Sequence, residues 1–329
     1  MLSNLLFLIK LIRVLKKYNV LILINKNIRF KFLFIFFTNL ISIGVSYDKN
    51  HKNKSDGLRI AQALNELGPS FVKLGQLIST RPDIVGNTIA EDLSLLRDNL
   101  PPFSRKIAIE IIEDEFGTSI DSIFSQFSEP IAAASIAQVH FAKIKSSNTE
   151  IDVAVKVLRP EIEKIINQEM ERLEWLTTFM ENFTEFQRLR PNSIIKKAKE
   201  VIKFELDLRY EAAAASELSE NTNMDESFYV PKVYWDKVTQ KILTMEKIIG
   251  VPADKIDELN EKKVNKKQAA ENLIINFLRQ SIRDGYFHAD LHQGNLFLNP
   301  KGKLLAVDFG IMGRFCLLYT SPSPRDRVR

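Results

Sequence analysis

The sequence predicts an α+β fold of two lobes, and the order of its patterned segments is the main reason. Helical spacing dominates the first part of the chain, strand-like segments follow between residues 139 and 158, and helical spacing returns around an acid-rich loop near the carboxyl end. The chain has 329 residues, 45% of them apolar, which is enough to build a sizeable core. We therefore expect a cleft between two lobes.

The first 47 residues combine apolar side chains with cations, and no acid appears before Asp48. The uncharged run 32–47 contains 16 residues, and a spanning helix needs about 20. These 47 residues contain no Ala-x-Ala signal-cleavage site. We expect a helix that lies on the membrane, with its cations facing anionic headgroups. A buried helical hairpin is the alternative.

The remaining elements follow from periodicity and from turn residues. A polar linker covers 48–56, and helical patterning follows at 58–64 and 64–79. Gly68-Pro69 punctuates the second run, and Arg81-Pro82-Asp83 stops it. Ser104 and Gly117 mark the ends of a helix over 104–116. Further strands are predicted at 139–145, 151–158, 229–235, 241–246 and 304–307, and further helices at 161–186, 193–218 and 266–284.

Charge and cysteine content exclude several classes of protein. Lysine and arginine (46) barely exceed aspartate and glutamate (41), so no cationic field indicates a nucleic-acid partner. Cys316 is the single cysteine, which excludes an intramolecular disulfide and a cysteine-rich metal site. Two of the four histidines fall in one loop, so a histidine zinc site is disfavoured and a reducing compartment is expected.

The segment from His288 to Asn295, followed by Asp308-Phe309-Gly310, carries the chemistry. Asp290 and Asn295 lie five residues apart and Asp308 follows a predicted strand, which is the order of groups that manage Mg²⁺ and a nucleoside triphosphate in kinases. Mg²⁺ prefers oxygen ligands, so Asn295 and Asp308 are candidate metal ligands.

Lys156, in Val153-Ala-Val-Lys156, is the candidate contact for the phosphates. Val155 and Val157 point to the opposite face of the strand. A solvent-facing lysine at a strand edge satisfies that alternation equally well.

The predicted phosphate-covering loop departs from ordinary protein kinases. No G-x-G-x-x-G occurs, and Ala132, Ala133, Ala134 and Ser135 precede the paired strands instead. Glycine permits positive φ and close backbone approach, whereas the Cβ of alanine resists both. We expect different geometry around the γ-phosphate, and ordinary packing is the alternative.

Four signatures together resemble the UbiB family of atypical kinases, which support ubiquinone biosynthesis. They are Lys73-Leu-Gly-Gln76, the alanine loop with Lys156, Glu205-Leu-Asp207, and the catalytic loop with Asp-Phe-Gly. The resemblance covers about 58–314 and implies a protein-kinase-like two-lobed fold with an added N-terminal helical extension. Without it, Lys73 would be taken for a solvated helix lysine.

The resemblance also implies roles for individual residues. Lys73 and Gln76 would lie on an added helix that covers the active site and meets Glu205 and Asp207. Glu211 would pair with Lys156. Asp290 would be the catalytic-loop acid, and Glu246 would belong to the hinge against adenine. The nucleotide would be ATP with Mg²⁺, contacted by residues 132–135, Lys156, Glu205, Asp207 and Glu246.

The implied function is an ATP-dependent phosphotransferase or ATPase at the cytoplasmic face of the bacterial inner membrane. Its partners would be an anionic membrane surface, prenylated phenol or quinone precursors and other ubiquinone-biosynthesis enzymes. Three alternatives remain: a scaffold that binds nucleotide without turnover, a phosphotransferase of the aminoglycoside or choline kinase type, and a flavin monooxygenase. The last is disfavoured because no dinucleotide-binding glycine fingerprint is present.

The predicted domains are a membrane-surface segment (1–47), a helical extension (48–118), an N-lobe (119–250), the start of a C-lobe (251–314) and a tail (315–329). The tail contains two Ser-Pro steps and no helical periodicity. We expect a truncated or mis-joined product near Phe315 with an incomplete second lobe, so that the isolated chain is unstable or inactive. A natural short C-terminal arm is the alternative.

Overall fold

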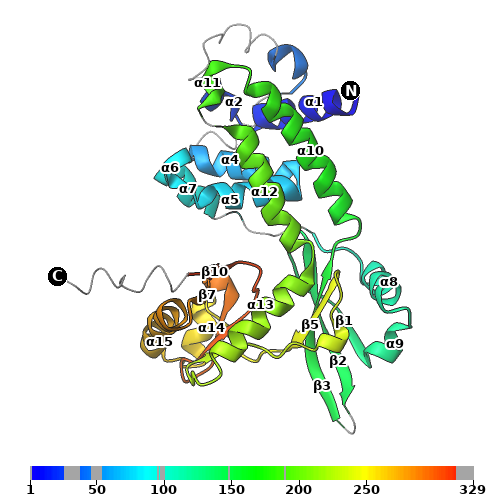
Figure 1. Cartoon of the computed structure of the whole chain (residues 1–329), viewed down its shortest axis with the longest axis vertical. Coiled ribbons are helices and arrows are strands. Elements are labelled where there is room, and N and C mark those ends of the chain that lie inside the picture. The colour runs from blue at the N-terminus through cyan, green and yellow to red at the C-terminus, as the bar shows by residue number, and fades with distance from the viewer. Residues whose placement is uncertain are drawn as a thin grey trace, which may run out of the picture. The chain divides into compact units, whose positions relative to one another are not determined.

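The computed structural model forms two compact units (Figure 1). It describes residues 2–25, 38–45, 54–94, 96, 101–146, 149–188 and 190–315. The first unit comprises Met1–Pro102, Ala133–Ala137 and Arg159–Leu206, and the second comprises Phe103–Ala132, Gln138–Leu158 and Asp207–Arg329. The domain boundaries drawn from the sequence stay a prediction.

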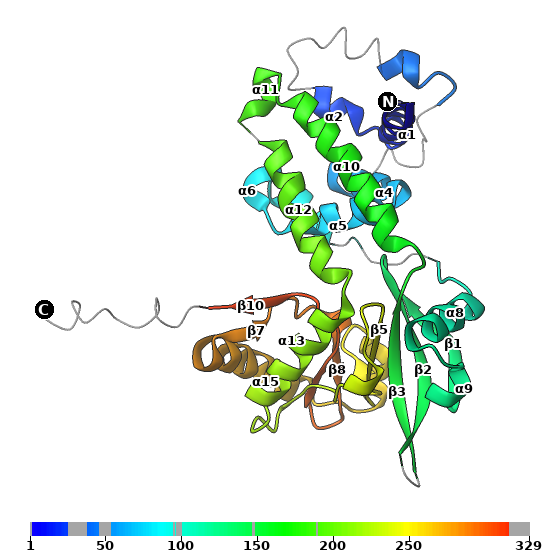
Figure 2. The same ribbon diagram turned by 45° about the vertical axis from the view of Figure 1, so that its right-hand side comes forward.

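The first unit is helical. Its elements are α1 (Leu2–Lys17), α2 (Leu21–Asn25), α4 (Asp56–Leu67), α5 (Pro69–Ser79), α6 (Pro82–Val85), α7 (Asn87–Ser94), α10 (Ile162–Met180), α11 (Thr184–Gln187) and α12 (Pro191–Glu205). Helices α10 and α12 run side by side, and α5 packs against both (Figure 2). Helix α1 packs on α4. Within the described ranges, no helix has both the length and the apolar content to span a bilayer.

Local sequence explains the corner between α4 and α5. The Ser55 hydroxyl caps α4 by accepting from the N–H of Leu58. Gly68 has φ +128°, a conformation that side chains rarely adopt, and Pro69 occupies the first position of α5. The chain therefore turns where the sequence places Gly-Pro.

The second unit begins with a four-stranded sheet in the order β1 (Gln126–Ala133), β2 (Ala137–Ser146), β3 (Thr149–Leu158) and β5 (Ile242–Glu246). Helices α8 (Arg105–Phe116) and α9 (Ile120–Ile123) lie beside it (Figure 2). Side chains of β3 and α8 share an apolar core that includes Val153, Val155 and Ile112. As predicted, Ser104 caps α8 and Gly117 ends it in the left-handed region.

The remainder of the second unit is built around short strands. Helix α13 (Leu208–Asn221) packs against β5. A second sheet has the order β4 (Phe228–Tyr229), β9 (Leu304–Ala306), β8 (Leu296–Leu298) and β6 (Val251–Pro252), and β7 (Tyr286–His288) pairs with β10 (Met312–Arg314). The helical elements are η2 (Trp235–Lys237), α14 (Ile256–Glu261), α15 (Lys266–Leu278), the π-helical turn η3 (Arg279–Asp284) and η4 (Gln293–Asn295).

Several predicted elements are corrected by the structure. The helix predicted at 193–218 is two helices, because α12 ends at Glu205 and Asp207 caps α13. The first of these two helices begins at Pro191, two residues before the predicted start at 193. The segment predicted as helix at 266–284 leaves the α-helical pattern at Arg279. Strand β1, the two-residue strand β6 and the three-residue strands β7, β8 and β10 were not predicted.

Two sequence predictions fall largely on residues that the structure does not describe. The uncharged run 32–47 is described only over 38–45, and the tail is described only at Phe315. The N–H of Phe315 donates to the carbonyl of Gly285 at 2.8 Å. The predicted junction near this residue stays a prediction.

Candidate active site

A buried ion pair between Lys156 and Glu211 forms the centre of the candidate site. Lys156 lies on β3 opposite Leu243 of β5, and its strand neighbours Val155 and Val157 are fully buried on the other face. Its ammonium Nζ is 2.9 and 2.8 Å from the two carboxylate oxygens of Glu211 on α13. The lysine side chain is therefore held inside the unit by a bidentate contact.

A second carboxylate faces the same ammonium. Asp308 Oδ1 lies 3.6 Å from Lys156 Nζ, and the Asp308 side chain is 53% exposed whereas Glu211 is 7% exposed. Burial raises the pKa of Glu211, and Lys156 opposes that shift. The two acids consequently differ: Glu211 is a buried partner, and Asp308 is open to an added cation.

Two strand pairings bring the catalytic loop and the Asp-Phe-Gly segment together. In the β8–β9 pair, Leu296 lies opposite Ala306, and the Val307 N–H donates to the carbonyl of Asn295 at 2.9 Å. In the β7–β10 pair, the Ala289 N–H donates to the carbonyl of Ile311 at 3.1 Å. Because of these two pairings, residues 289–295 of the catalytic loop lie next to residues 307–311, which contain Asp-Phe-Gly.

Within the loop, Asn295 is bonded to Asp290. The Asn295 amide Nδ2 donates to the backbone carbonyl of Asp290 at 3.1 Å and to its carboxylate Oδ2 at 3.2 Å. Asn295 is buried, and the Asp290 side chain is 41% exposed. The Asn295 amide nitrogen is thus used inside the loop, which leaves its Oδ1 as the atom that can bind a metal ion.

Asp308 adopts a left-handed backbone conformation with φ +60°. Aspartate tolerates this region better than most residues because its short side chain can bond its own backbone. Here the Gly310 N–H donates to Asp308 Oδ1 at 3.3 Å. The turn after β9 therefore presents the carboxylate on a constrained segment of backbone.

His288 links the loop to the Asp-Phe-Gly segment, a role that the sequence reasoning did not assign. Its Nδ1 accepts from the N–H of Asp290, its Nε2 lies 3.5 Å from the carbonyl of Val307, and its ring is 5.6 Å from that of Phe309. The side chain of Gln280 in turn accepts from the His288 N–H at 3.2 Å. Burial lowers the pKa of His288, so the ring is neutral at physiological pH. The sequence signal that could have predicted this role was the position of His288 directly before Ala289-Asp290 in the loop motif.

The predicted hinge residue Glu246 uses its carboxylate internally. It accepts from the hydroxyl of Tyr229 and from the N–H of Lys232. Burial and the Glu246 carboxylate raise the pKa of Tyr229 to about 12. An adenine base that bound beside Glu246 would therefore contact backbone groups and not the Glu246 side chain.

The signature Lys73-Leu-Gly-Gln76 contacts one of the two acids in the signature Glu205-Leu-Asp207. Lys73 Nζ lies 2.7 Å from Glu205, and both side chains are largely buried in the first unit. Gln76 donates to the carbonyl of Leu96 at 3.4 Å. Asp207 accepts from the N–H and guanidinium of Arg209 in the second unit, which lowers the pKa of Asp207. The expectation that this helix covers the active site stays a prediction.

The alanine loop is held by an arginine that the sequence reasoning missed. The Arg159 Nε and Nη2 donate to the carbonyl of Ala134 at 3.0 and 2.8 Å, and its Nη1 donates to the carbonyl of Pro101 at 2.9 Å. The Arg159 N–H donates to the carbonyl of Ile136.

Ser135 is fully buried, and its hydroxyl has no hydrogen-bond partner among the described residues. Ala132 and Ala133 close β1. The only sequence signal was the position of Arg159 directly after β3.

The comparisons with known proteins agree with these motifs. Residues 95–316 match the model of the ABC1 atypical kinase-like domain. Proteins named probable protein kinase UbiB are similar to this chain: that of Pseudomonas paraeruginosa is 40% identical over 263 residues, and that of Pseudomonas entomophila is 41% identical over 265. These alignments cover 78% and 79% of this chain. The chain spans about half the length of these curated relatives, 49% in both cases.

A solved structure gives the same fold. The complex of Rv3197 with erythromycin from Mycobacterium tuberculosis matches with a TM-score of 0.54 and 26% identity, over 74% of this chain and 59% of that one. The kinase-like α+β fold predicted from the sequence is therefore confirmed.

Proposed function

Because this chain belongs to the UbiB family of atypical kinases with an ABC1 domain, we propose that it binds ATP with Mg²⁺ and transfers or hydrolyses the γ-phosphoryl group. Following the sequence resemblance, this activity would support the biosynthesis of prenylated quinones at the cytoplasmic face of the bacterial inner membrane. Prenylated phenol or quinone precursors and other enzymes of that biosynthesis would be its partners.

One observation carries the ATP-binding part of the proposal. Lys156 is bound by Glu211 through two contacts of 2.8 and 2.9 Å, and Asp308 lies 3.6 Å from the same ammonium. A buried acid that fixes a lysine beside a half-exposed acid matches the arrangement in which a kinase lysine contacts phosphates and the Asp-Phe-Gly acid holds magnesium. An ordinary structural ion pair needs no second carboxylate beside it.

The donor set fits Mg²⁺. Among the described residues, no group of three or more His, Cys, Asp or Glu side chains could hold a metal by itself. Mg²⁺ is usually bound through one or two carboxylates together with phosphate oxygens and water, so such a group is not required. Asp308 supplies an open carboxylate and Asn295 supplies Oδ1. The bound ion would neutralise charge on the triphosphate.

The other residues of the site would orient and support these groups. The carboxylate of Asp290 is positioned by Asn295 and by the backbone bond to His288, and it would align the attacking hydroxyl or water. Glu211 would keep the Lys156 ammonium in place. The alanine loop replaces the glycine-rich loop of ordinary protein kinases. ATP hydrolysis is at least as compatible with it as phosphoryl transfer to a protein.

The membrane-surface part of the proposal rests on helix α1. Leu2, Leu5 and Leu6 are 71%, 52% and 59% exposed. Lys10 and Arg13 are exposed on the same helix. Exposed leucines next to cations suit the interface of an anionic membrane.

Radiolabelled ATP tests the proposal on the full chain. The chain is incubated with Mg²⁺, with or without anionic liposomes and phenolic quinone mimics, and binding, phosphate release and label transfer are measured separately. We expect Mg²⁺-dependent binding that Asp308→Asn abolishes and that the exposed control Asp236→Asn leaves unchanged. Binding without turnover would favour a nucleotide-dependent scaffold. No binding with or without Mg²⁺ would end the proposal.

A further inference from the structure

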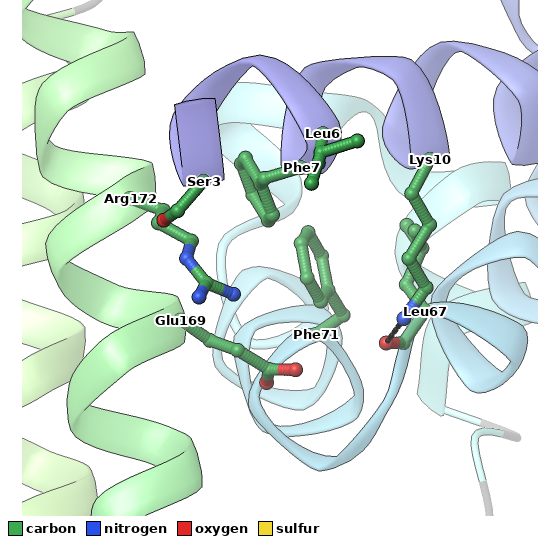
Figure 3. A pocket seen from close by; sticks show the side chains of 8 residues that line it. All are labelled: Ser3, Leu6, Phe7, Lys10, Leu67, Phe71, Glu169 and Arg172. Atoms are coloured by element: carbon green, nitrogen blue, oxygen red, sulfur yellow. Dashed lines mark hydrogen bonds between the residues drawn. The ribbon is translucent and has the colours of Figure 1, made fainter. Parts of the chain in front are cut away.

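A pocket of about 250 Å³ lies inside the first unit, and none of the residues of the candidate active site lines it (Figure 3). Helix α1 forms one wall, α10 forms another, and Leu67 and Phe71 close it from α4 and α5. Phe7 of α1 stacks on Phe71 with ring centroids 6.1 Å apart, and the Lys10 ammonium donates to the carbonyl of Leu67 at 3.1 Å. The wall that α1 contributes is thus fixed to α4 and α5.

One carboxylate oxygen in the pocket lacks a hydrogen-bond donor among the residues that the structure describes. Glu169 Oε2 is buried and has no hydrogen-bond partner among the described residues. Gly68 lies beside this carboxylate, since an added Cβ there would be 3.5 Å from Oε1 and 3.9 Å from Oε2. A buried carboxylate oxygen without a donor is costly. A small ligand group that donates hydrogen bonds to Glu169 Oε2, preferably a cationic one, would therefore be favoured in this pocket.

A guanidinium lines the same pocket. Arg172 lies three residues after Glu169 on α10, a spacing at which two side chains can pair. No ion pair joins them in the described part of the chain, and Figure 3 shows both directed toward the space beneath α1. The pocket thus offers an acceptor and an anion-binding group to one ligand.

The mouth of the pocket adjoins an apolar surface. Leu6 lines the pocket and is itself 59% exposed, and Leu2 and Leu5 are exposed on the same helix. A ligand that carries acyl chains could keep them at this surface while its polar end enters the pocket. A soluble zwitterion would gain nothing from the leucines.

We propose that this pocket binds the headgroup of a phospholipid that carries a primary ammonium and a phosphodiester. The ammonium donates to Glu169 beside the aromatic ring of Phe71, and the phosphodiester faces Arg172. A trimethylammonium group has no N–H and leaves the Glu169 oxygen without its donor. The inference rests on the membrane-surface part of the proposed function.

Vesicle flotation of the full chain tests the proposal. Three vesicles are compared: phosphatidylcholine alone, with added phosphatidylethanolamine, and with added phosphatidylglycerol. We expect the wild-type chain to prefer the ethanolamine vesicle over phosphatidylcholine by about tenfold, equivalent to about 1.4 kcal/mol. Glu169→Gln should remove this preference without changing binding to phosphatidylglycerol. Glu171→Gln makes the same charge change at an exposed position of α10 and should retain the preference.

Calorimetric titration of the wild-type chain with glycerophosphoethanolamine and glycerophosphocholine provides a second test that needs no variant. We expect heat of binding from the ethanolamine compound only. Equal flotation with all three vesicles, an ethanolamine preference that survives Glu169→Gln, or equal titrations would overturn the proposal. If no vesicle is bound, the membrane role itself fails, and the titration still decides whether the pocket recognises the headgroup.

Discussion

Replacing Lys156 by Met would leave the carboxylate of Glu211 buried without its partner. Glu211 is 7% exposed and Lys156 is 15% exposed, and breaking a buried pair on one side costs about 3–5 kcal/mol. At the 2.8–2.9 Å separation, an effective dielectric near 20 gives an attraction of about 6 kcal/mol, slightly above the upper end of that range. We therefore expect a loss of about 3–5 kcal/mol in the free energy of unfolding at about pH 8.

The loss should depend on pH. Burial already raises the pKa of Glu211, and removing Lys156 removes the charge that opposes the shift. A carboxyl whose folded-state pKa lies above its unfolded value, about 4.3, is a source of instability that grows as pH rises toward the folded-state value. At about pH 5 the variant can bind a proton at Glu211, so its loss should be less than about half of that at pH 8.

Urea denaturation followed by tryptophan fluorescence measures this effect. The chain has two tryptophans, Trp175 in the first unit and Trp235 in the second. A Trp175→Phe background leaves a reporter in the unit that contains the pair. Lys143→Met, which breaks the partly exposed pair with Glu150, should cost less than about 1 kcal/mol. Combining Lys156→Met with Glu211→Gln should remove the pH dependence. Equal losses at both pH values would refute the reasoning.

Three further predictions concern local structure. Gly75→Ala places a Cβ 2.5 Å from Leu96 and 2.6 Å from Leu64, so we expect a loss of about 1–3 kcal/mol, measured by thermal unfolding; an unchanged melting temperature would contradict it. Arg159→Ala removes three side-chain bonds to backbone carbonyls, and we expect faster amide hydrogen exchange over residues 133–137, whereas Arg172→Ala should leave that exchange unchanged. Asp207→Ala removes the cap of α13 and should cost about 1 kcal/mol. Because the pKa of Asp207 is lowered, its contribution is present above the unfolded pKa and is lost as pH falls; a loss that persists at about pH 2 would count against it.

The loop geometry around His288 shows where sequence reasoning reached its limit. The motif from His288 to Asn295 predicted a loop with an acid and an amide, and the Asp290–Asn295 contact needs only five residues of chain. Strands β7, β8 and β10 contain three residues each, which is too short for an alternating pattern to stand out. Those strands set the registers that bring the loop to the Asp-Phe-Gly turn.

The break between Glu205 and Asp207 has a related cause. Apolar spacing continues through this segment, so the sequence predicted one helix from 193 to 218. Asp207 instead bonds the N–H of Arg209 and starts α13. Aspartate can cap a helix or lie within its first turn, and only the surrounding packing selects between them.

The sequence by itself determined the family of the fold, the caps at Ser104 and Gly117, the corner at Gly68-Pro69 and the motif residues of the site, because each depends on a local pattern or on a short signature. The resemblance implied that Glu211 pairs with Lys156, and the structure supplies the 2.8 Å distance. Only the tertiary structure decided that Arg159 holds the carbonyl of Ala134, and that Oε2 of Glu169 is buried without a donor among the described residues. These contacts join residues that are distant in the chain or depend on how neighbouring helices exclude water, and no local pattern encodes either property.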